Sequence, residues 1–197
     1  MSTGRLEAFS DGVLAILITI MVLELRVPLG PHGSQLSALR PLWPIGLTYA
    51  LSFVYLGIYW NNHHHLFHRT SAVTGGILWA NLNLLFWLSL FPFTTGWVGE
   101  NHFAKTPTIV YGVVLLLAAI AYYVLQSVIV AHEGRDSALA QALGRDWKGK
   151  VSPVIYCVGI ALGLKSPWAA MAAYAVVALI WVIPDRRLER VDVDEST

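Results

Sequence analysis

The stretch that decides the fold runs from Arg5 to Leu25 and reads RLEAFSDGVLAILITIMVLEL. Its apolar part is long enough to cross a bilayer as one helix, because about 20 apolar residues span a hydrocarbon core about 30 Å thick. It also carries Ser10 and Asp11 near its start and Thr19 near its middle. Ionisable groups at membrane depth are costly and are usually functional. The stretch therefore predicts a membrane helix that does more than anchor the chain.

The composition of the whole chain is that of an integral membrane protein. Of its 197 residues, 56% are hydrophobic and only 13% are charged, whereas about a quarter of the residues in soluble domains are charged. Between Arg40 and Glu100, Arg69 is the only Lys, Arg, Asp or Glu. A net charge of +1 without a long basic run indicates no nucleic-acid partner. The single cysteine, Cys157, excludes an intramolecular disulfide.

Six membrane spans fit the hydropathy pattern, and the basic residues support that count. The spans are expected near residues 8–26, 42–66, 76–98, 108–131, 151–165 and 167–184. Lys and Arg gather on the cytoplasmic side of membrane proteins. Six spans with both termini inside place nine of the 13 basic residues there, namely Arg5, Arg69, Arg135, Arg145, Lys148, Lys150, Arg186, Arg187 and Arg190. The remaining four are Arg26, Arg40, Lys105 and Lys165. We expect an all-α, multi-pass protein with one domain over residues 1–197.

Three further segments complete this prediction. The start of the chain has no basic region followed by a short apolar core and an Ala-x-Ala site, so we expect the first span to be retained rather than cleaved. Residues 133–150 are polar and helix-permissive and predict a cytoplasmic loop helix. Residues 185–197 form a charged tail that we expect to fray.

The residues of the first helix separate into two faces. At 100° per residue, one row is formed by Ile16, Thr19, Ile20 and Leu23. Asp11 lies about 130° from the middle of that row, and Ser10 lies further round. Both groups cannot face one axis, so one faces a pore or partner while neighbouring helices hold the other. Arg5 lies on a different face from Asp11, which favours a partner for Asp11 on another helix.

A polar cluster, WNNHHHLFH, occupies residues 60–68 at the end of the second predicted span. His64 and His68 are four residues apart, a spacing that metal sites use. No Cys, Asp or Glu stands beside them in the sequence, which disfavours a metal or catalytic role. Hydrogen bonding to buried partners, or a position near the lipid headgroups, is the favoured interpretation.

The third predicted span carries two amides and a proline. Asn81 and Asn83 are expected to hydrogen-bond across helices, as polar side chains at membrane depth normally do. Pro92 is expected to kink or end the span. Nearly all intramembrane polar groups therefore belong to the first three spans, and the last three are expected to act as scaffold.

At these positions the sequence resembles the transmembrane protein 175 family of potassium channels. The string R-x-x-x-F-S-D with its continuation comprises Arg5, Phe9, Ser10, Asp11, Ala15, Ile16 and Thr19. Supporting matches are Trp60, Asn62, His63 and His64 in the second span, and Asn81, Pro92 and Phe93 in the third. The resemblance covers the first half of the chain, and the second half matches only in its number of spans.

The resemblance implies a potassium channel without the Thr-Val-Gly-Tyr-Gly carbonyl filter, a string that this chain lacks. Prokaryotic members carry one six-helix unit and assemble as homotetramers in which the first helices line the pore. Carried onto this chain, the implied pore-lining and gate residues are Ile16, Thr19, Ile20 and Leu23. The implied structural network comprises Arg5, Phe9, Ser10, Asp11, Trp60, His63, His64 and Asn81.

The sequence thus predicts a passive, modestly potassium-selective channel in a bacterial cell membrane. Its expected partners are potassium ions, the lipid bilayer and further copies of itself, with no cofactor, no resident metal and no enzymatic activity. The main alternative is a proton-coupled or other secondary transporter that uses Asp11 and the His63–His68 cluster as a relay. Such transporters typically have internal repeats or broken helices at midplane, and neither is evident. A membrane enzyme with a histidine metal site is disfavoured because carboxylate and thiolate ligands are missing.

Overall fold

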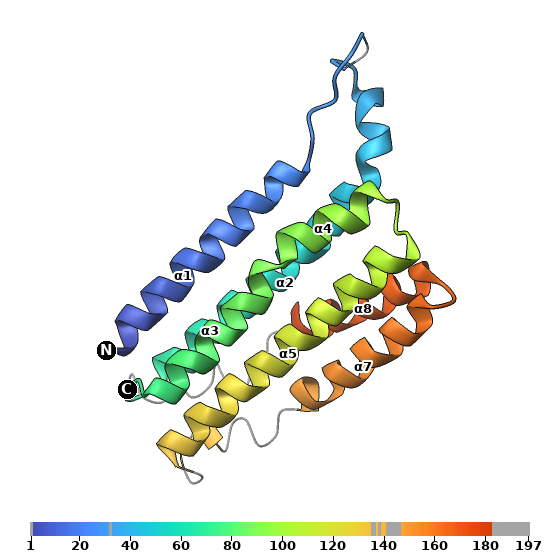
Figure 1. The fold of residues 1–197 in the computed structure, drawn as a ribbon. Coiled ribbons are helices and arrows are strands. Elements are labelled where there is room, and N and C mark those ends of the chain that lie inside the picture. The colour runs from blue at the N-terminus through green and yellow to red at the C-terminus, as the bar shows by residue number, and fades with distance from the viewer. Residues whose placement is uncertain (1, 32, 135–136, 138, 141–146, 183–197) are drawn as a thin grey trace.

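The computed structural model describes residues 2–31, 33–134, 137, 139–140 and 147–182, and this part of the chain contains helices and no strand. The α-helices are α1 (Thr3–Ile20), α2 (Trp43–His68), α3 (Gly75–Ser89), α4 (Phe91–Glu100), α5 (Lys105–Glu133), α7 (Trp147–Gly163) and α8 (Pro167–Val182). Two 3-10 helices extend them: η1 (Met21–Glu24) continues α1, and η2 (Leu36–Leu42) leads into α2. Figure 1 shows one bundle with α1 at one edge and the α7–α8 pair at the other.

Four helical stretches are long and apolar enough to cross a membrane. They are Thr3–Glu24, Leu36–His68, Gly75–Glu100 and Lys105–Glu133, and they coincide with the first four predicted spans. The fifth and sixth predicted spans correspond to α7 and α8, which have 17 and 16 residues. Helices of that size are about 25 Å long at 1.5 Å per residue, which is less than a hydrocarbon core of about 30 Å.

The third predicted span is divided into two helices, α3 and α4, as the proline in it predicts. α3 ends at Ser89 and α4 begins at Phe91, with Pro92 in its first turn. Proline has no backbone N–H and its ring clashes with the preceding turn, so a regular helix cannot continue through it. The prediction that Pro92 kinks or ends a helix is therefore confirmed as a break between α3 and α4.

Residues 135–136, 138 and 141–146 of the predicted loop helix lie outside the described residues, and so does the charged tail over residues 185–197. α5 ends at Glu133 and is followed by Gly134 at a φ of +97°, a conformation that favours glycine. α7 begins at Trp147, four residues before the predicted start of the fifth span at residue 151. Its first turns remain helical because they pack on α8, where the indole Nε1 of Trp181 donates to the hydroxyl of Ser152 over 2.8 Å.

Glycines let neighbouring helices of the bundle approach each other closely. The ring of Tyr174 in α8 lies against Gly112 of α5 and Gly159 of α7, and a Cβ at either glycine would overlap it. Similarly, α4 approaches α2 at Gly99, which lies against the backbone of Ile45. Close approach at small residues is a usual basis of helix association in membranes, where lipid removes the hydrophobic driving force.

Polar side chains reinforce the same helix pairs. The hydroxyl of Ser52 in α2 lies 2.6 Å from that of Thr95 in α4 and 2.9 Å from that of Tyr111 in α5. The hydroxyl of Tyr55 donates to the carbonyl of Tyr174 in α8 over 2.6 Å. These hydrogen bonds are buried, and they join α2 to α4, α5 and α8 in the interior of the bundle.

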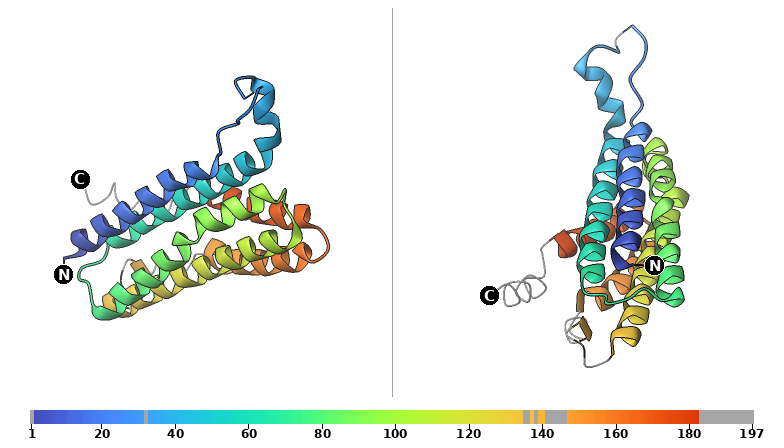
Figure 2. Two further views of the ribbon diagram at one scale, coloured as in Figure 1. Left: turned by 45° about the horizontal axis from the view of Figure 1, so that its top comes forward. Right: turned by 90° about the vertical axis from the view of Figure 1, so that its left-hand side faces the viewer.

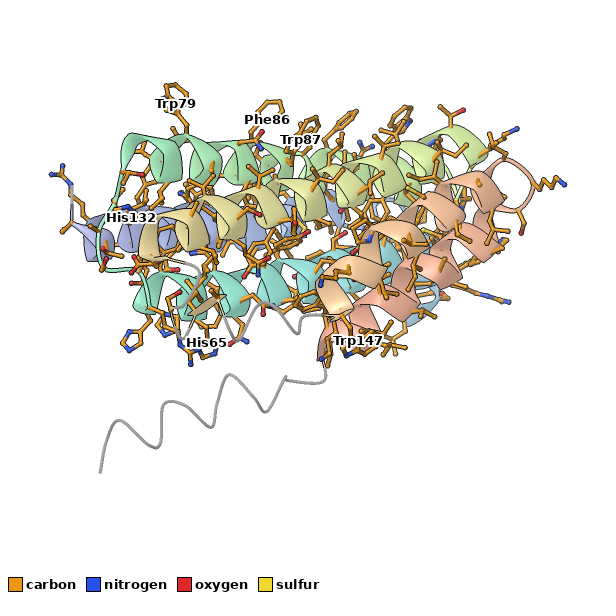
Figure 3. All side chains as sticks on the ribbon, turned by 90° about the horizontal axis from the view of Figure 1, so that it is seen from below. His65, Trp79, Phe86, Trp87, His132 and Trp147 are labelled. Carbon is orange, nitrogen blue, oxygen red and sulfur yellow. The ribbon has the colours of Figure 1, made fainter. Side chains whose placement is uncertain are left out.

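Aromatic side chains extend outward from the far side of α3. Trp79 is 73% exposed and Phe86 is 56% exposed, and both point away from the bundle in Figure 3. Exposed aromatic and apolar side chains of this kind fit a helix whose outer face meets lipid or another protein chain. The outer surface of the described bundle is therefore that of a membrane protein.

Candidate functional site

One face of α1 packs into the bundle. Its buried residues recur every three or four positions and are Leu6, Ser10, Leu14, Leu17 and, in η1, Met21. This face contacts α2, α3 and α4, and α1 lies along α2 in both views of Figure 2. Because a helix repeats every 3.6 residues, burying this row turns the opposite row outward.

The opposite face of α1 is apolar and exposed. Ile16 is 62% exposed, Ile20 44% and Leu23 71%, and Thr19 lies among them, also exposed. Gly12 and Ala15 on the same side are exposed as well. The four residues that the sequence analysis grouped together thus form one uncovered surface in the described chain, which we call the α1 stripe (Ile16, Thr19, Ile20 and Leu23).

The hydroxyl of Thr19 is oriented by its own helix. Its oxygen lies 2.9 Å from the carbonyl of Ala15 and 3.0 Å from that of Ile16, so the hydrogen is donated inward. A hydroxyl oxygen has two acceptor lone pairs besides its hydrogen. The threonine therefore offers oxygen lone pairs on the surface of the α1 stripe, and such groups attract cations.

A buried chain of hydrogen bonds ties α1 to α3 and α2. The Asn81 side-chain nitrogen donates to the Ser10 hydroxyl over 2.9 Å, and that hydroxyl donates to the carbonyl of Leu6 over 2.9 Å. The Asn81 side-chain oxygen lies 2.8 Å from Nε2 of His63, so Nε2 is the donor and carries the hydrogen. Ser10 and Asn81 are 0% exposed and His63 is 1% exposed. Three of the predicted network residues are thus brought together.

Two polar atoms beside this chain of bonds lack a partner. Oδ1 of Asp11 and Nδ1 of His63 are buried and make no hydrogen bond within the described part of the chain. Buried polar atoms are normally bonded to protein or water, so an exception calls for an explanation. These two unbonded polar atoms therefore lie close to the buried hydrogen bonds, on the side of α1 away from the α1 stripe.

The other predicted network residues lie elsewhere. Arg5 is exposed, as are Phe9 and Trp60, at 52% and 48%. His64 lies at the surface, where its Nδ1 is 2.7 Å from Oε1 of Glu7. In a single chain these four residues therefore lie at the surface rather than among the buried hydrogen bonds of Ser10, His63 and Asn81.

Glu7 is a residue that sequence reasoning missed. It stands four positions before Asp11, so it projects from the same side of α1, and that spacing was the available signal. Glu7 adds a carboxylate beside His64 of the histidine cluster. Even so, the described residues contain no group of three or more His, Cys, Asp or Glu side chains that could hold a metal ion. The rings of His64 and His68 stack with their centroids 6.1 Å apart.

Together these features define a multi-pass helical membrane protein whose first helix is fixed by a buried polar network and presents an uncovered apolar face. A family model described as the endosomal/lysosomal potassium channel TMEM175 matches residues 5–92. The chain belongs to the TMEM175 family, because it is 54% identical over 190 residues to a potassium channel of Chryseobacterium sp. (strain P1-3), covering 96% of this chain and 97% of the relative. The resemblance seen in the sequence is confirmed at the level of the family.

Two further comparisons extend this result. The crystal structure of a lysosomal potassium-selective channel TMEM175 homolog from Chamaesiphon minutus superposes with a TM-score of 0.81 at 31% identity, covering 92% of this chain and 96% of that one. The endosomal/lysosomal proton channel TMEM175 of Gallus gallus is 32% identical over 146 residues, which are 68% of this chain but only 29% of the relative. These two bacterial relatives therefore match along nearly their whole length, and the animal relative matches over part of its own.

Proposed function

We propose that this chain, a potassium channel by its family, conducts ions through a central pore that the α1 stripe lines in a homotetramer. Membership of a channel family makes it a channel rather than an enzyme, and its bacterial relatives make it a multi-pass protein of the plasma membrane. The observation that carries the pore proposal is the uncovered apolar face of α1, interrupted by one hydroxyl. A helix at the edge of the bundle is available to other copies of the chain.

The proposed assembly follows from symmetry. Soluble and membrane oligomers of one chain usually close around a rotation axis, so that each residue forms a ring. Four copies of α1 at such an axis would give successive rings of Ile16, Thr19, Ile20 and Leu23. In this arrangement α7 and α8 act as the fifth and sixth spans, both termini face the cytoplasm, and residues 1–197 form one domain.

The proposed conduction mechanism uses side chains rather than a carbonyl filter. Narrow apolar rings gate by dewetting, and they strip part of the water from a passing ion. Potassium loses its water at lower cost than sodium, so such rings favour potassium modestly. The outward lone pairs of Thr19 replace part of the lost hydration and add to this preference.

The buried network then fixes the rotation of α1. Because Ser10 is bonded to Asn81 on one side of the helix, the α1 stripe on the other side is directed toward the axis. Arg5, Phe9 and Trp60 are exposed in a single chain. Their place in the network implied by the family is therefore at contacts between copies, together with His64, whose side chain is 50% exposed.

Cysteine crosslinking tests the assembly. Cys157 is the only cysteine, so Cys157→Ser gives a background free of cysteine. Leu23→Cys in that background is expected to crosslink to dimers in membranes, because four copies of residue 23 meet at the axis. Leu179→Cys, exposed on α8, is the matched control and is expected to stay monomeric. Crosslinking of the control alone would refute the axial position of α1.

Bilayer recordings test the constriction. Ile16→Asn places a polar ring in the pore, so the leak current is expected to rise and the preference for potassium over sodium to fall. Leu179→Asn introduces the same side chain on α8, which does not line the proposed pore, and should leave currents unchanged. Wild-type currents in Ile16→Asn would exclude Ile16 as the constriction.

Proton conduction is a second candidate function. It is favoured by the buried, unbonded Oδ1 of Asp11 and Nδ1 of His63, which are groups able to accept protons, and by the name of the Gallus gallus relative. Asp11→Asn keeps the shape of the side chain and removes its charge. Under a pH gradient without potassium, a proton current that this variant abolishes would support the candidate. An equal current in both proteins would exclude Asp11 as the carrier.

A further inference from the structure

The α1 stripe ends beside a carboxylate. Glu24 directly follows Leu23, the last residue of the stripe, and is partly exposed at the end of η1. In the proposed assembly both termini face the cytoplasm, so this end of the stripe is extracellular. We propose that the Glu24 carboxylates of the four copies concentrate potassium at the extracellular mouth of the pore and raise the inward conductance. The proposal rests on the proposed function, because it needs the α1 stripe at the axis.

Carboxylates are scarce on this side of the membrane. Between Asp11 and Glu133 the chain contains only two acidic residues, Glu24 and Glu100. Glu100 is paired, since its Oε1 lies 2.7 Å from Nη2 of Arg26. Glu24 makes no ion pair and no hydrogen bond within the described part of the chain. Its negative charge is therefore left without a neighbouring cation to neutralise it, whereas the charge of Glu100 is neutralised.

The fold holds this carboxylate in a defined place. η1 packs on α2 and α4, and the Glu24 carboxylate lies against Gly96 of α4, where an added Cβ would overlap it. Glycine at that position therefore lets the side chain lie along α4. An open pocket that includes Glu24, Arg26, Glu100 and His102 in its lining adjoins the carboxylate. Hydrated cations outside the membrane therefore have access to it.

The unpaired basic residues of this side stand away from the proposed axis. Lys105 is the first residue of α5, and Lys165 lies in the turn between α7 and α8. The α7–α8 pair occupies the edge of the bundle opposite α1 (Figure 1), and a helix with its side chains is about 10 Å wide. Arg40 lies in η2, before the start of α2. Charges separated by more than a Debye length, about 8 Å in physiological salt, are largely screened. Glu24 is therefore the unneutralised charge next to the α1 stripe.

A ring of carboxylates at a pore mouth raises the local concentration of cations, and cation channels use such rings. The effect depends on salt, because the Debye length is about 30 Å at 0.01 M and about 3 Å at 1 M. The Glu24 charge should therefore matter in dilute potassium and have little effect in concentrated potassium. Because the charge stands at one mouth only, inward current should gain more than outward current.

Single-channel recordings of the full chain in planar bilayers with symmetric potassium test the proposal. Glu24→Gln keeps the shape of the side chain and removes its charge. In about 10 mM potassium its inward conductance is expected to fall roughly twofold or more, with a smaller fall in outward conductance. In about 1 M potassium it should match the wild type. Glu24→Lys reverses the charge and should lower the inward conductance further.

Two variants serve as controls. Glu24→Asp keeps the charge and is expected to conduct as the wild type at both concentrations. Glu133→Gln removes a carboxylate at the opposite, cytoplasmic end of the bundle, where α5 ends, and should leave the inward conductance unchanged.

The salt dependence and the Leu23→Cys crosslinks separate the possible failures. A fall in the conductance of Glu24→Gln that is equal in dilute and concentrated potassium would indicate a structural effect and overturn the proposal. Wild-type conductance in Glu24→Gln, while Leu23→Cys crosslinks, would overturn the role of Glu24 and leave the axial position of α1 intact. Wild-type conductance without those crosslinks would overturn both.

Discussion

The side-chain nitrogen of Asn81 in α3 donates a hydrogen bond of 2.9 Å to the hydroxyl oxygen of Ser10 in α1. The oxygen of the same amide lies 2.8 Å from Nε2 of His63 in α2. One amide therefore joins three helices, and it does so on the face of α1 opposite the exposed α1 stripe. The rotation of the first helix about its own axis depends on this contact.

Asn81→Ala is expected to lower the stability of the protein by about 1–3 kcal/mol, because it leaves the buried Nε2–H of His63 without an acceptor. Thermal unfolding of the detergent-solubilised protein measures the loss. Asn83→Ala, two residues away and exposed, should stay within about 0.5 kcal/mol of the wild type. Equal losses of stability in the two variants would show that the hydrogen bonds of Asn81 do not stabilise the protein.

Thr19→Val is expected to reduce the permeability ratio of potassium to sodium while the conductance persists. The substitution keeps the size of the side chain and removes the oxygen whose lone pairs face outward. Reversal potentials under bi-ionic conditions measure the ratio. Thr19→Ser retains the hydroxyl and should behave as the wild type, and a fall of equal size in both variants would contradict the role of the oxygen.

Glu7→Gln is expected to change stability by less than about 1 kcal/mol, although the pair between Glu7 and His64 spans only 2.7 Å. The side chain of His64 is 50% exposed, and exposed ion pairs are weakened by solvent and salt. The difference from the wild type should shrink further at high ionic strength. A loss as large as that of Asn81→Ala, independent of salt, would show that the pair is a main support of α1.

Gly99→Ala is expected to destabilise the bundle by about 1–3 kcal/mol. The added Cβ would lie 2.5 Å from Cα of Ile45, and a backbone atom cannot move aside without separating α4 from α2. Gly57→Ala is the matched control, since nothing lies within 4 Å of its added Cβ. Because alanine favours helix over glycine by about 1 kcal/mol, that control should be neutral or stabilising in a thermal unfolding assay. The close contact would be discounted if both variants melted alike.

Several features of the fold were predictable because they depend on local pattern. The division of the third span follows from the missing N–H and the bulky ring of Pro92, which act wherever a proline enters a helix. The two faces of α1 follow from helical periodicity, which separates Ile16 from Ser10 whatever the neighbours are. α7 begins at Trp147, before the span expected from residue 151, because its first turn carries the polar Lys148, which hydropathy excludes from a membrane span.

The sequence by itself determined that this is a helical membrane protein, that its first helix has one apolar and one polar face, and that it resembles the TMEM175 channels. Periodicity, hydropathy and a short motif are properties of neighbouring residues, so they can be read along the chain. Only the tertiary structure decided which face is covered, that Asn81 is hydrogen-bonded to Ser10, and that Glu7 contacts His64. It also brought aromatic residues of α2, α5, α7 and α8 around one open pocket. These contacts join positions far apart in the sequence, and only the packing of whole helices selects them.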